Sequence, residues 1–530
     1  MKALKSLLVL LLTASLVSCL GGSFSSNEVA DGVPPAIIPL PNQVEWGDKM
    51  YKVPAQNKIC VGDINLDAGQ WLSELLKASG QEVEVVEGNA CGNWNLTLDP
   101  SLKTNLGEEG YSLDISEEGV TLKSASQAGL FYGIQTLRQM FPAQVEKQAA
   151  GEKPVYLRFV SIEDEPHFEW RGTMVDVARS FFGLEYLKKH VDRMAFYKMN
   201  RLHLHLSDDQ GWRIEIKSKP KLTEIGSKGS TIGGNSGYLT QKEYLELQEY
   251  AAARNIIVIP EIDMPGHVYA ALAAYPELSC DGYSNLTPAR ATPPELYSGY
   301  EVGWSKFCLE KPEIYDFVNE VIGEIAGITK GPWIHIGGDE IEDPRYEEFI
   351  VKADSIVRKY GKTAIGWEEA TKAEVDESFI SQEWHGEVES VVDVKVIESI
   401  CSNFYLDHAN VPGQENTLNW CKEDGVSLEN VYAFRSDKPN AIGVEAPVWT
   451  DPVLNEQMLD DRLWPRTVAV AEVGWTTPEK LEYQDFLNRL QEQAPRIRLM
   501  GINHHPTPEI KWDETEVSAN ASSVFSGFKP

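Results

Sequence analysis

The sequence predicts an α/β protein in which a smaller α+β domain precedes a (β/α)₈ barrel of the TIM-barrel class. Three observations support this prediction. The chain has 530 residues, too many for one compact domain. Hydrophobic residues make up 42% and charged residues 24%, which is ordinary for a globular protein with a substantial core. From about residue 161, short β-rich runs alternate with helical stretches in the order expected for βα units.

Residues 1–19 are expected to be an export signal that ends in a lipidation site. Two lysines precede an apolar run from Leu7 to Val17, which is too short to span a bilayer. The segment ends in Leu16-Val17-Ser18-Cys19, which resembles a bacterial lipobox, so Cys19 is the expected site of lipid attachment. The alternative is a plain cleaved signal with an incidental cysteine. Residues 20–33 are expected to form a flexible tether.

The net charge of −32 makes nucleic acid an unfavourable partner, because phosphate backbones are repelled and Lys and Arg are scattered along the chain. No segment after the signal is long and apolar enough to cross a membrane. We therefore expect an exported lipoprotein that faces the periplasm or the cell surface. It should contact the membrane only through its lipid anchor and bind no nucleic acid.

Residues 34–160 are expected to form the α+β domain. Tyr111, Leu113 and Ile115 alternate with polar residues, a turn follows at 117–119, and the alternation then resumes. Ser126–Met140 carries apolar residues at helical spacing. This pattern predicts a hairpin followed by a helix, and nothing in the region points to catalysis.

Residues 161–505 are expected to form the barrel. Amphipathic helices are predicted between its strands, among them 184–197 and 241–254. Residues 506–530 are polar, carry Pro506 and Pro508 near their start and are expected to be a weakly ordered tail. The eight strands are predicted near residues 171–177, 201–206, 256–260, 333–337, 363–367, 381–384, 403–406 and 443–449.

Six cysteines follow Cys19, and their even number permits disulfides in an exported protein. Neighbours in sequence could pair, and buried free thiols are an equally good interpretation. No CxxC spacing is present, so a zinc site is not expected. The six are Cys60, Cys91, Cys280, Cys308, Cys401 and Cys421.

The unusual residue clusters fall at the C-terminal ends of predicted strands, where barrel enzymes place their active sites. The strongest is His335-Ile336-Gly337-Gly338-Asp339-Glu340, which directly follows the apolar Trp333-Ile334. The paired glycines let the backbone turn and present two carboxylates to a cleft. Adjacent acids alone could be an ordinary solvated loop, but the preceding strand and the barrel context favour catalysis.

Consecutive carboxylates restrict the mechanism. Ordinary retaining glycosidases hold an acid and a nucleophile about 5–5.5 Å apart on either side of the scissile bond. Neighbours on one strand point in different directions and cannot easily flank a bond in this way. A glycosidase built on Asp339 and Glu340 would therefore need another nucleophile.

With these motifs, the chain resembles glycoside hydrolase family 20, the β-N-acetylhexosaminidases, over nearly its whole length after the signal. In that family the 2-acetamido oxygen of the substrate attacks the anomeric carbon. The resemblance implies that Glu340 is the general acid and later the general base. Asp339 would orient the acetamido group and stabilise the oxazolinium intermediate. We also expect the charge of Asp339 to raise the pKa of Glu340 and keep it protonated near neutrality.

Further motifs match the family. Trp170-Arg171-Gly172, followed by Asp176 and Arg179-Ser180-Phe181, resembles its first-strand signature, in which Arg171 would bind sugar hydroxyls. The alternative for Arg171 is a salt-bridged residue at the barrel rim. The resemblance also pairs Asp208 with His267 beside the general acid.

The second predicted strand, 203–213, contains two His and two Asp that could ligate zinc. The family has the same grouping without a metal, so we expect neither metal nor cofactor. His203 and His205 are then structural residues that face the barrel interior.

The resemblance assigns an acetamido pocket to aromatic residues at strand ends. Trp367, Trp384 and Trp449 would wall it, and the hydroxyl of Tyr405 would bind the acetamido oxygen. Asp407 matches a further sugar-binding position. At Asp451 the chain departs from the family, which usually has Glu there, so the contact to the outer hydroxyls of the sugar is in question. Glu368, Glu369, Glu383 and His385 are expected to be solvated loop residues.

The leading hypothesis is an exo-acting, retaining β-N-acetylhexosaminidase that acts on an oligosaccharide or glycoconjugate. One alternative is a disaccharide-releasing enzyme of the same family, similar to a lacto-N-biosidase, for which loop 280–308 could shape a wider cleft. Another is a glycan-binding lipoprotein without catalysis. An unrelated barrel hydrolase would cleave sugars that lack the acetamido group. The sequence leaves the oligomeric state and the choice between GlcNAc and GalNAc open.

Overall fold

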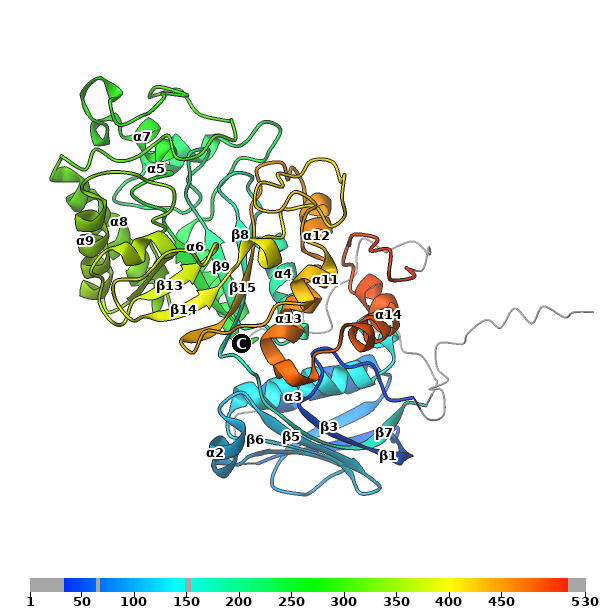
Figure 1. Cartoon of the computed structure of the whole chain (residues 1–530). Coiled ribbons are helices and arrows are strands. Elements are labelled where there is room, and N and C mark those ends of the chain that lie inside the picture. Colours follow the sequence, from blue (N-terminus) through cyan, green and yellow to red (C-terminus); the bar gives the residue numbers. More distant parts are fainter. Residues whose placement is uncertain (1–32, 63–66, 148–153, 513–530) are drawn as a thin grey trace, which may run out of the picture. The chain divides into compact units, whose positions relative to one another are not determined.

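The protein, shown as a computed structural model in Figure 1, is described over residues 33–62, 67–147 and 154–512. The predicted export signal, Cys19 and residues 20–32 of the tether lie outside the described residues, as does the tail from residue 513. Within those ranges, no helix combines the length and the apolar character needed to cross a membrane.

The N-terminal domain is built on one mixed sheet. In the part of the chain that is described, it has seven strands in the order β1-β7-β5-β6-β4-β2-β3. Helix α3 (Gln127–Met140) packs on this sheet, as Figure 1 shows, and α1 (Asp67–Ala78) contacts it as well. A short helix, α2 (Lys103–Leu106), precedes the central hairpin. The strands are β1 (Gln43–Lys52), β2 (Gln56–Val61), β3 (Glu82–Glu87), β4 (Trp94–Leu98), β5 (Tyr111–Ser116), β6 (Gly119–Ser124) and β7 (Tyr156–Asp164).

The predicted hairpin and helix are confirmed. Strands β5 and β6 pair antiparallel, and Ser116 lies opposite Gly119, whose φ of +130° is a conformation that favours glycine. Ser126 caps α3, because its hydroxyl accepts from the backbone N–H groups of Ala128 and Gly129 at 3.0 and 3.4 Å. The sheet continues to Asp164, a few residues beyond the expected domain boundary at 160.

The second domain is a closed parallel barrel, as predicted. Its strands, counted over the described ranges, run in the order β8-β9-β10-β11-β12-β13-β14-β15 and return to β8. Their carboxyl ends therefore open on the same face, where the βα loops gather. The strands are β8 (Trp170–Asp176), β9 (Arg201–His205), β10 (Ile257–Glu261), β11 (Trp333–His335), β12 (Thr363–Trp367), β13 (Ile380–Glu383), β14 (Lys395–Glu398) and β15 (Ala441–Val448).

The prediction of the seventh strand was wrong. It was placed near 403–406, but the strand is β14, and residues Cys401–Phe404 form the short helix α10. The apolar centre of β14 is only Val396 and Ile397, flanked by Lys395 and Glu398, so its pattern is weak. Phe404, Tyr405 and Leu406 are buried outside the barrel sheet. Their apolar run therefore matched the pattern of a strand better than β14 does.

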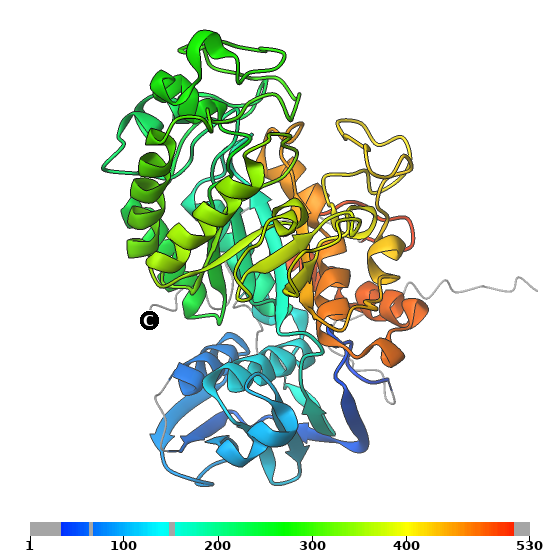
Figure 2. The same ribbon diagram turned by 60° about the vertical axis from the view of Figure 1, so that its left-hand side comes forward.

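Helices follow the barrel strands and cover them on the outside (Figure 2). The last helix, α14, instead contacts the N-terminal domain near residues 143–147. The helices are α4 (Leu184–Phe196), α5 (Lys221–Glu224), α6 (Gln241–Ala252), α7 (Tyr269–Ala274), α8 (Glu313–Ile328), α9 (Tyr346–Lys359), α11 (Leu428–Tyr432), α12 (Glu456–Leu463), α13 (Arg466–Trp475) and α14 (Tyr483–Leu499).

Buried polar contacts join the two domains at the amino ends of the barrel strands. The ammonium of Lys198 lies 3.1 Å from the carboxylate of Asp164, which also accepts from the hydroxyl of Tyr111 at 2.7 Å and from the indole of Trp475 at 3.0 Å. All four side chains are fully buried. Because a buried charge is costly unless it is paired, this contact fixes how β7 meets the barrel.

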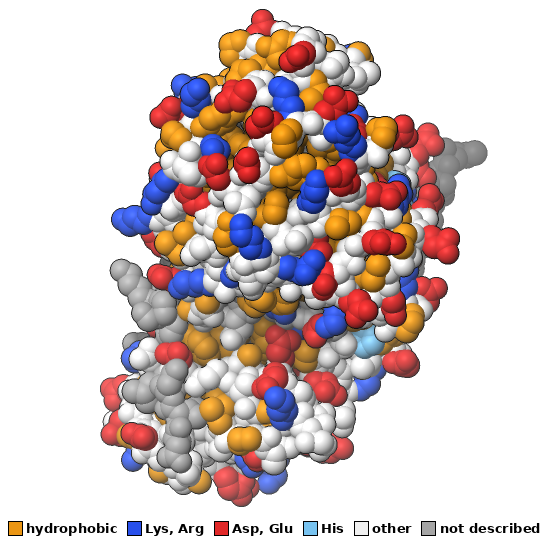
Figure 3. Space-filling view, turned by 90° about the vertical axis from the view of Figure 1, so that its left-hand side faces the viewer, with side chains coloured by type: hydrophobic (Ala, Val, Ile, Leu, Met, Phe, Trp, Pro, Cys, Tyr) orange, Lys and Arg blue, Asp and Glu red, His pale blue; other side chains and the backbone are white. Residues whose placement is uncertain are grey.

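The six cysteines form three disulfides between sequence neighbours, which settles the question that the sequence left open. The pairs are Cys60–Cys91, Cys280–Cys308 and Cys401–Cys421. The first links β2 to the turn before β4, and the other two close long βα loops. On the surface seen in Figure 3, basic and acidic side chains are interspersed, in line with the scattered Lys and Arg of the sequence.

Candidate active site

A pocket of about 430 Å³ opens beyond the carboxyl ends of the barrel strands. Its size suits one small ligand, and its walls combine aromatic and aliphatic side chains with several charged groups. It is lined by Arg179, His267, Tyr300, Val302, Asp339, Glu340, Trp367, Trp384, Tyr405, Asp407, Leu418, Trp420, Trp449, Asp451 and Pro452.

The Asp339-Glu340 pair enters this pocket through a sharp turn after β11. Gly337 and Gly338 have φ values of +68° and +108°, and Glu340 itself has a φ of +56°. A side chain at Gly337 is impossible, because its Cβ would lie 1.7 Å from a carboxylate oxygen of Asp263. The positive φ of Glu340 is a rare conformation for a non-glycine residue, and such conformations cluster at functional sites.

His267 lies between the Asp339-Glu340 pair and a further acid, Asp208. Its Nε2 is 3.3 Å from Glu340 Oε2 and 3.5 Å from Asp339 Oδ2, while its Nδ1 is 3.5 Å from Asp208 Oδ1. The structure thus brings together all four residues that the sequence predicted for this part of the site. Burial lowers the pKa of His267, but the charges of Asp208 and Asp339 outweigh it and hold that pKa well above its usual value.

The protonation of the pair differs from the prediction. Burial raises the pKa of Asp339 to about 7, against the opposing charge of His267. Burial also raises the pKa of Glu340, but the close positive charge of His267 and the charge of Arg179 outweigh it, so that pKa is lowered. The expectation that Asp339 alone would raise the pKa of Glu340 was wrong because it omitted the two neighbouring cations. The opposite directions of the two shifts favour the proton on Asp339 in this geometry.

Asp208 and Asp209 hold the loops around His267. Asp208 accepts from His205 at 2.8 Å and pairs with Arg179 at 2.7 Å, which contributes to a lowered pKa despite burial. Asp209 accepts from the hydroxyl of Ser305 and from the backbone N–H of residue 269 at 3.0 Å. Loop 280–308 is therefore tied directly to the segment that carries His267.

Beneath the pocket, buried His and Glu side chains alternate through the barrel interior. Glu261 contacts His203 at 3.0 Å, His205 at 2.6 Å and His335 at 3.2 Å, and Glu445 contacts His203 at 2.8 Å. Burial lowers the pKa of His203, yet the charge of Glu445 and the bond to Glu261 raise it to about 9 overall. His203 and His205 thus face the barrel interior, as expected.

Several clusters of three side chains, in the barrel interior and around His267, have donor atoms within 4.8 Å of one another, which is close enough to hold a metal ion. The donor set of two imidazoles and a carboxylate would suit zinc. In the interior groups, however, the imidazoles and carboxylates contact each other. The groups are His203, Glu261 and His335; His205, Glu261 and Asp263; Asp208, Asp209 and His267; and Asp263, His267 and Asp339.

Arg171 does not reach the pocket, which corrects its predicted role in sugar binding. It is the second residue of β8, at the amino end of the strand, and its side chain is fully buried. Its guanidinium pairs with Glu109 of the N-terminal domain at 2.8 Å and lies 5.0 Å from the ring of Trp475. The structure therefore places Arg171 at the domain junction, closer to the alternative of a salt-bridged residue.

Arg179 is the arginine of the pocket. It follows the carboxyl end of β8, pairs with Asp208 at 2.7 Å, and lies 4.9 Å from the ring of Trp449. Its Nε is buried and has no hydrogen-bond partner among the described residues. The sequence contained the signal that distinguishes the two arginines, because barrel sites form at the carboxyl ends of strands. Arg179 is thus a candidate for binding sugar hydroxyls.

Aromatic side chains form the walls, and the predicted ones converge. Trp384 stacks parallel to Tyr405, with ring centroids 6.4 Å apart and planes 16° apart, and Trp449 lies 5.8 Å from Trp367. Burial, together with the charge of Asp339, raises the pKa of Tyr405 well above its usual value. Tyr405 therefore presents a neutral hydroxyl that can donate a hydrogen bond into the pocket.

The acids after β12 hold Trp384, which corrects their interpretation as solvated. Glu368 is buried and accepts from the backbone N–H groups of Trp384 at 3.2 Å and Gly386 at 2.7 Å. Glu369 accepts from the Trp384 indole at 3.1 Å. Glu383 is also buried and pairs with Lys438.

Asp407 and Asp451 both line the pocket. Burial raises the pKa of Asp451 to about 7, although Arg179 lowers it in part. Asp407 Oδ2 contacts His408 at 3.1 Å, and Asp407 Oδ1 is buried without a hydrogen-bond partner in the described ranges. Both acids are therefore available to hydroxyl groups of a ligand.

The mouth of the pocket has an apolar rim that sequence reasoning missed. Tyr300 and Val302 from loop 280–308 are 40% and 46% exposed, and Leu418 and Trp420 from the opposite loop are 37% and 51% exposed. Figure 2 shows both loops on the same side of the barrel. No strand pattern marks such residues, because they lie in irregular segments.

Comparison with known proteins places this geometry in a family. The catalytic-domain model of glycosyl hydrolase family 20 matches residues 168–349 and 343–478, and the domain 2 model of the same family matches residues 34–165. The chain belongs to glycoside hydrolase family 20. It is therefore a glycoside hydrolase, and its barrel is the catalytic domain of that family.

Relatives of this family 20 chain carry hexosaminidase names. A beta-hexosaminidase of Porphyromonas gingivalis is 35% identical over 516 residues, which cover 89% of this chain but only 65% of that protein. A beta-N-acetylhexosaminidase of Cellulomonas fimi is 34% identical over 90% of this chain and 97% of its own length. The structure of Streptomyces plicatus N-acetyl-beta-hexosaminidase in complex with Thio-NAglucal has a TM-score of 0.84 and 37% identity, and the match covers 92% of this chain and all of that one.

Proposed function

We propose that this glycoside hydrolase is an exo-acting, retaining β-N-acetylhexosaminidase that removes terminal GlcNAc or GalNAc. The observation that carries the proposal is that one pocket is lined by the Asp339-Glu340 pair, four tryptophans and Tyr405. An apolar aromatic wall suits the acetyl methyl group, and the Tyr405 hydroxyl suits the acetamido oxygen. The names of the relatives agree with this substrate class.

In the proposed mechanism, the acetamido oxygen of the bound sugar attacks its own anomeric carbon. Glu340 donates a proton to the glycosidic oxygen as the bond to the leaving group breaks. Asp339 accepts from the acetamido N–H and stabilises the positive oxazolinium. Glu340 then takes a proton from water as the water attacks the anomeric carbon, which restores the acetamido group and releases the sugar with retained configuration.

The protonation found for the pair sets a condition for this mechanism. The pKa of Glu340 is lowered while that of Asp339 is raised to about 7, so the proton favours Asp339 in the free enzyme. Catalysis needs the proton on Glu340 and the charge on Asp339. A substrate whose acetamido N–H donates to Asp339 favours the charged form of that carboxyl. Substrate binding therefore favours the state in which Asp339 is charged and Glu340 holds the proton.

The test is hydrolysis of 4-nitrophenyl β-glycosides of GlcNAc, GalNAc, glucose and galactose by the protein without its signal. We expect cleavage of the two acetamido sugars only. Activity on glucose or galactose would contradict substrate assistance. Inactivity on all four, with release of a disaccharide from a longer substrate, would favour the enzyme similar to a lacto-N-biosidase. Inactivity on every glycoside with retained binding of GlcNAc would favour a binding protein.

We also propose that the protein is exported and anchored by a lipid on Cys19. The support is the sequence Leu16-Val17-Ser18-Cys19 after a short apolar run. Labelling with a radioactive fatty acid in the producing cell should mark the protein, and Cys19→Ala should abolish the label. Equal labelling of both forms would contradict the anchor.

A further inference from the structure

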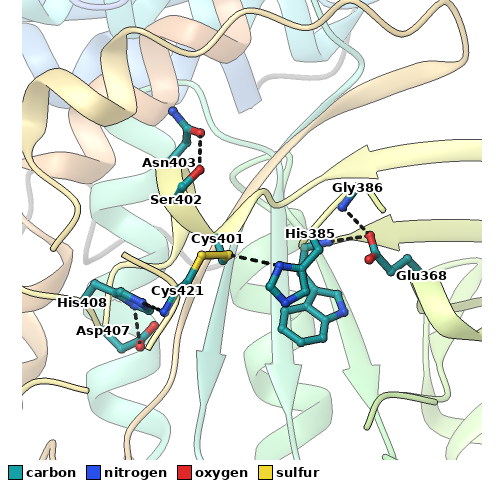
Figure 4. Close-up of a disulfide and its surroundings, with 10 residues drawn as sticks. Glu368, His385, Gly386, Cys401, Ser402, Asn403, Asp407, His408 and Cys421 are labelled. Atoms are coloured by element: carbon teal, nitrogen blue, oxygen red, sulfur yellow. Dashed lines mark hydrogen bonds and ion pairs between the residues drawn. A yellow bond between two sulfur atoms is a disulfide. The ribbon is translucent and has the colours of Figure 1, made fainter. Parts of the chain in front are cut away.

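The segment between Cys401 and Cys421 contributes several groups to the pocket. The disulfide joins the start of α10 to the end of the segment, as Figure 4 shows. Within this closed loop lie Tyr405, Asp407 and Trp420, all of which line the pocket. The placement of these groups therefore depends on how the loop is held internally.

His408 is a fully buried residue inside this loop and bonds through both ring nitrogens. Its Nδ1 lies 3.1 Å from Asp407 Oδ2, and its Nε2 accepts from the backbone N–H of Cys421 at 3.2 Å. Figure 4 shows the imidazole between these two partners, beside the disulfide. The ring of Trp420 packs edge-on against it at 5.4 Å.

The partners of His408 determine its tautomer. A backbone N–H can only donate, so Nε2 must be the acceptor and cannot carry a hydrogen. The neutral ring then carries its hydrogen on Nδ1, which points at the Asp407 carboxylate. His408 therefore donates to Asp407 while it accepts from Cys421.

This arrangement leaves one oxygen of Asp407 for a ligand. Oδ2 is occupied by His408, whereas Oδ1 is buried and has no hydrogen-bond partner in the described part of the chain, although Asp407 itself lines the pocket. A carboxylate fixed at one oxygen cannot rotate freely, so its other oxygen points in a defined direction. A free buried acceptor of this kind is costly unless a ligand fills it.

The backbone at this point is held separately. Arg466 is buried, and its guanidinium donates to the carbonyls of Leu406 at 2.6 Å and His408 at 3.0 Å, on either side of Asp407. It also donates to the carbonyl of Val426, beyond the disulfide. Removing the imidazole therefore leaves the main chain of Asp407 supported.

We propose that His408 is a positioning residue that aims the carboxylate of Asp407 at the sugar hydroxyls and couples it to the disulfide-closed loop. The proposal rests on the proposed function, because Asp407 must bind the substrate for its orientation to matter. It adds a residue that does not itself line the pocket.

Two substitutions separate the two bonds of His408. In His408→Asn the amide N–H lies near the position of Nδ1 and keeps the bond to Asp407. In His408→Gln the amide oxygen lies near Nε2 and keeps the bond to Cys421 but loses the one to Asp407. We expect Gln to raise KM and the Kd for GlcNAc about tenfold with kcat nearly unchanged, because binding is weakened equally in the ground and transition states. In His408→Asn, both KM and Kd should stay within about threefold of the wild-type values, because the bond to Asp407 is kept.

The control is a double-mutant cycle with Asp407→Ala. If His408 acts through Asp407, His408→Gln should have no further effect on KM or Kd in the Asp407→Ala background. The Kd is read from the fluorescence of the pocket tryptophans, so it needs no turnover. His504→Gln, at a site remote from the pocket, controls for the loss of an imidazole elsewhere.

Three outcomes decide the matter. A tenfold effect of Gln in the wild-type background that disappears without Asp407 supports the proposal. An equal effect in both backgrounds, or a larger effect of Asn than of Gln, overturns it and leaves His408 with a general structural role. If the wild-type protein binds GlcNAc but cleaves none of the glycosides, the proposed catalytic function fails while the cycle in Kd still tests His408.

Discussion

The barrel carries buried charges at both ends of its strands, and the two groups differ in how they are paired. At the amino ends, Lys198 pairs with Asp164, and Arg171 pairs with Glu109, at 3.1 and 2.8 Å. At the carboxyl ends, His267 faces three carboxylates at 3.3–3.5 Å, and one of these, Asp208, also contacts Arg179 at 2.7 Å and His205 at 2.8 Å.

The difference reflects two uses of buried charge. The junction matches each acid to a base at short distance, which holds two domains together. The pocket has more acids than bases, and buried polar atoms of His267, Asp339 and Asp407 lack hydrogen-bond partners among the described residues. Burial in this acidic pocket raises the pKa of Asp339 to about 7, and the unpaired atoms remain for a ligand to satisfy. The comparison predicts that changes at one end affect stability and changes at the other affect catalysis.

The largest expected effect comes from removing the proposed general acid. We expect Glu340→Gln to lower kcat about 10³-fold on a GlcNAc disaccharide, whose leaving group needs a proton, and much less on a 4-nitrophenyl glycoside. The melting temperature should remain close to that of the wild type. Steady-state kinetics on both substrates and calorimetry make the measurement. Glu342→Gln, at an exposed acid two residues away, should leave kcat unchanged. Equal losses on both substrates would contradict the role of Glu340.

At the junction, the expected effect is on stability. Arg171→Met leaves Glu109 without its guanidinium partner and should lower the free energy of unfolding by about 3 kcal/mol, while kcat/KM stays within about twofold. Denaturant titration and kinetics measure the two quantities. The control is Glu169→Gln, which removes an exposed ion pair with Lys395 and should cost less than about 0.5 kcal/mol. If Arg171→Met instead had a raised KM and normal stability, the result would support the predicted contact between Arg171 and sugar hydroxyls.

The third prediction concerns pH. His267 lowers the pKa of both Glu340 and Asp339. In His267→Asn both pKa values should rise, so protonated Glu340 should persist to higher pH and charged Asp339 should form only at higher pH. Both limbs of the kcat/KM profile should therefore move to higher pH, by about one unit. A profile with unchanged midpoints would mean that His267 does not control the pair.

The smallest expected effect is at Asp451. Its pKa is about 7 in the folded protein and 3.8 in an ordinary environment, so the folded state binds the proton more tightly. Stability is therefore lost as pH rises from about 4 to about 7, and it stays at that lower level at higher pH. Asp451→Asn avoids this loss, and its melting temperature should exceed that of the wild type by about 2 °C at pH 8, with a smaller difference at pH 5. Glu389→Gln, at an exposed loop acid, should show no such pH trend.

The sequence predicted most of the architecture because the barrel strands are apolar runs between helical segments. The exception was β14, where Val396 and Ile397 alone carry the apolar signal. The Asp339-Glu340 pair, His267, Asp208 and the tryptophans were found because they directly follow strands or carry a family motif. Their convergence on one pocket then followed from the barrel.

The remaining features depend on three-dimensional surroundings. Arg171 and Arg179 belong to the same motif, and only the direction of β8 separates a junction residue from a pocket residue. The lowered pKa of Glu340 depends on cations that come from other strands. The rim residues Tyr300 and Trp420 lie in loops whose course no periodic pattern predicts.

Those two loops are each closed at the base by a disulfide. The Cα atoms of Cys280 and Cys308 are 5.0 Å apart, and those of Cys401 and Cys421 are 6.2 Å apart. Each loop leaves and re-enters the scaffold at nearly one point. The 280–308 loop can therefore change in length or be exchanged as a cassette, provided that its contacts with neighbouring loops are kept, namely Ser305 with Asp209, Gly299 with Gln210 and Glu295 with Tyr269.

The 401–421 loop cannot be exchanged so freely, because Tyr405 and Asp407 belong to it. New specificities for the remainder of the glycan are therefore best engineered in the first cassette, around Tyr300 and Val302. A directed-evolution library would therefore randomise the 280–308 loop and keep the 401–421 loop unchanged.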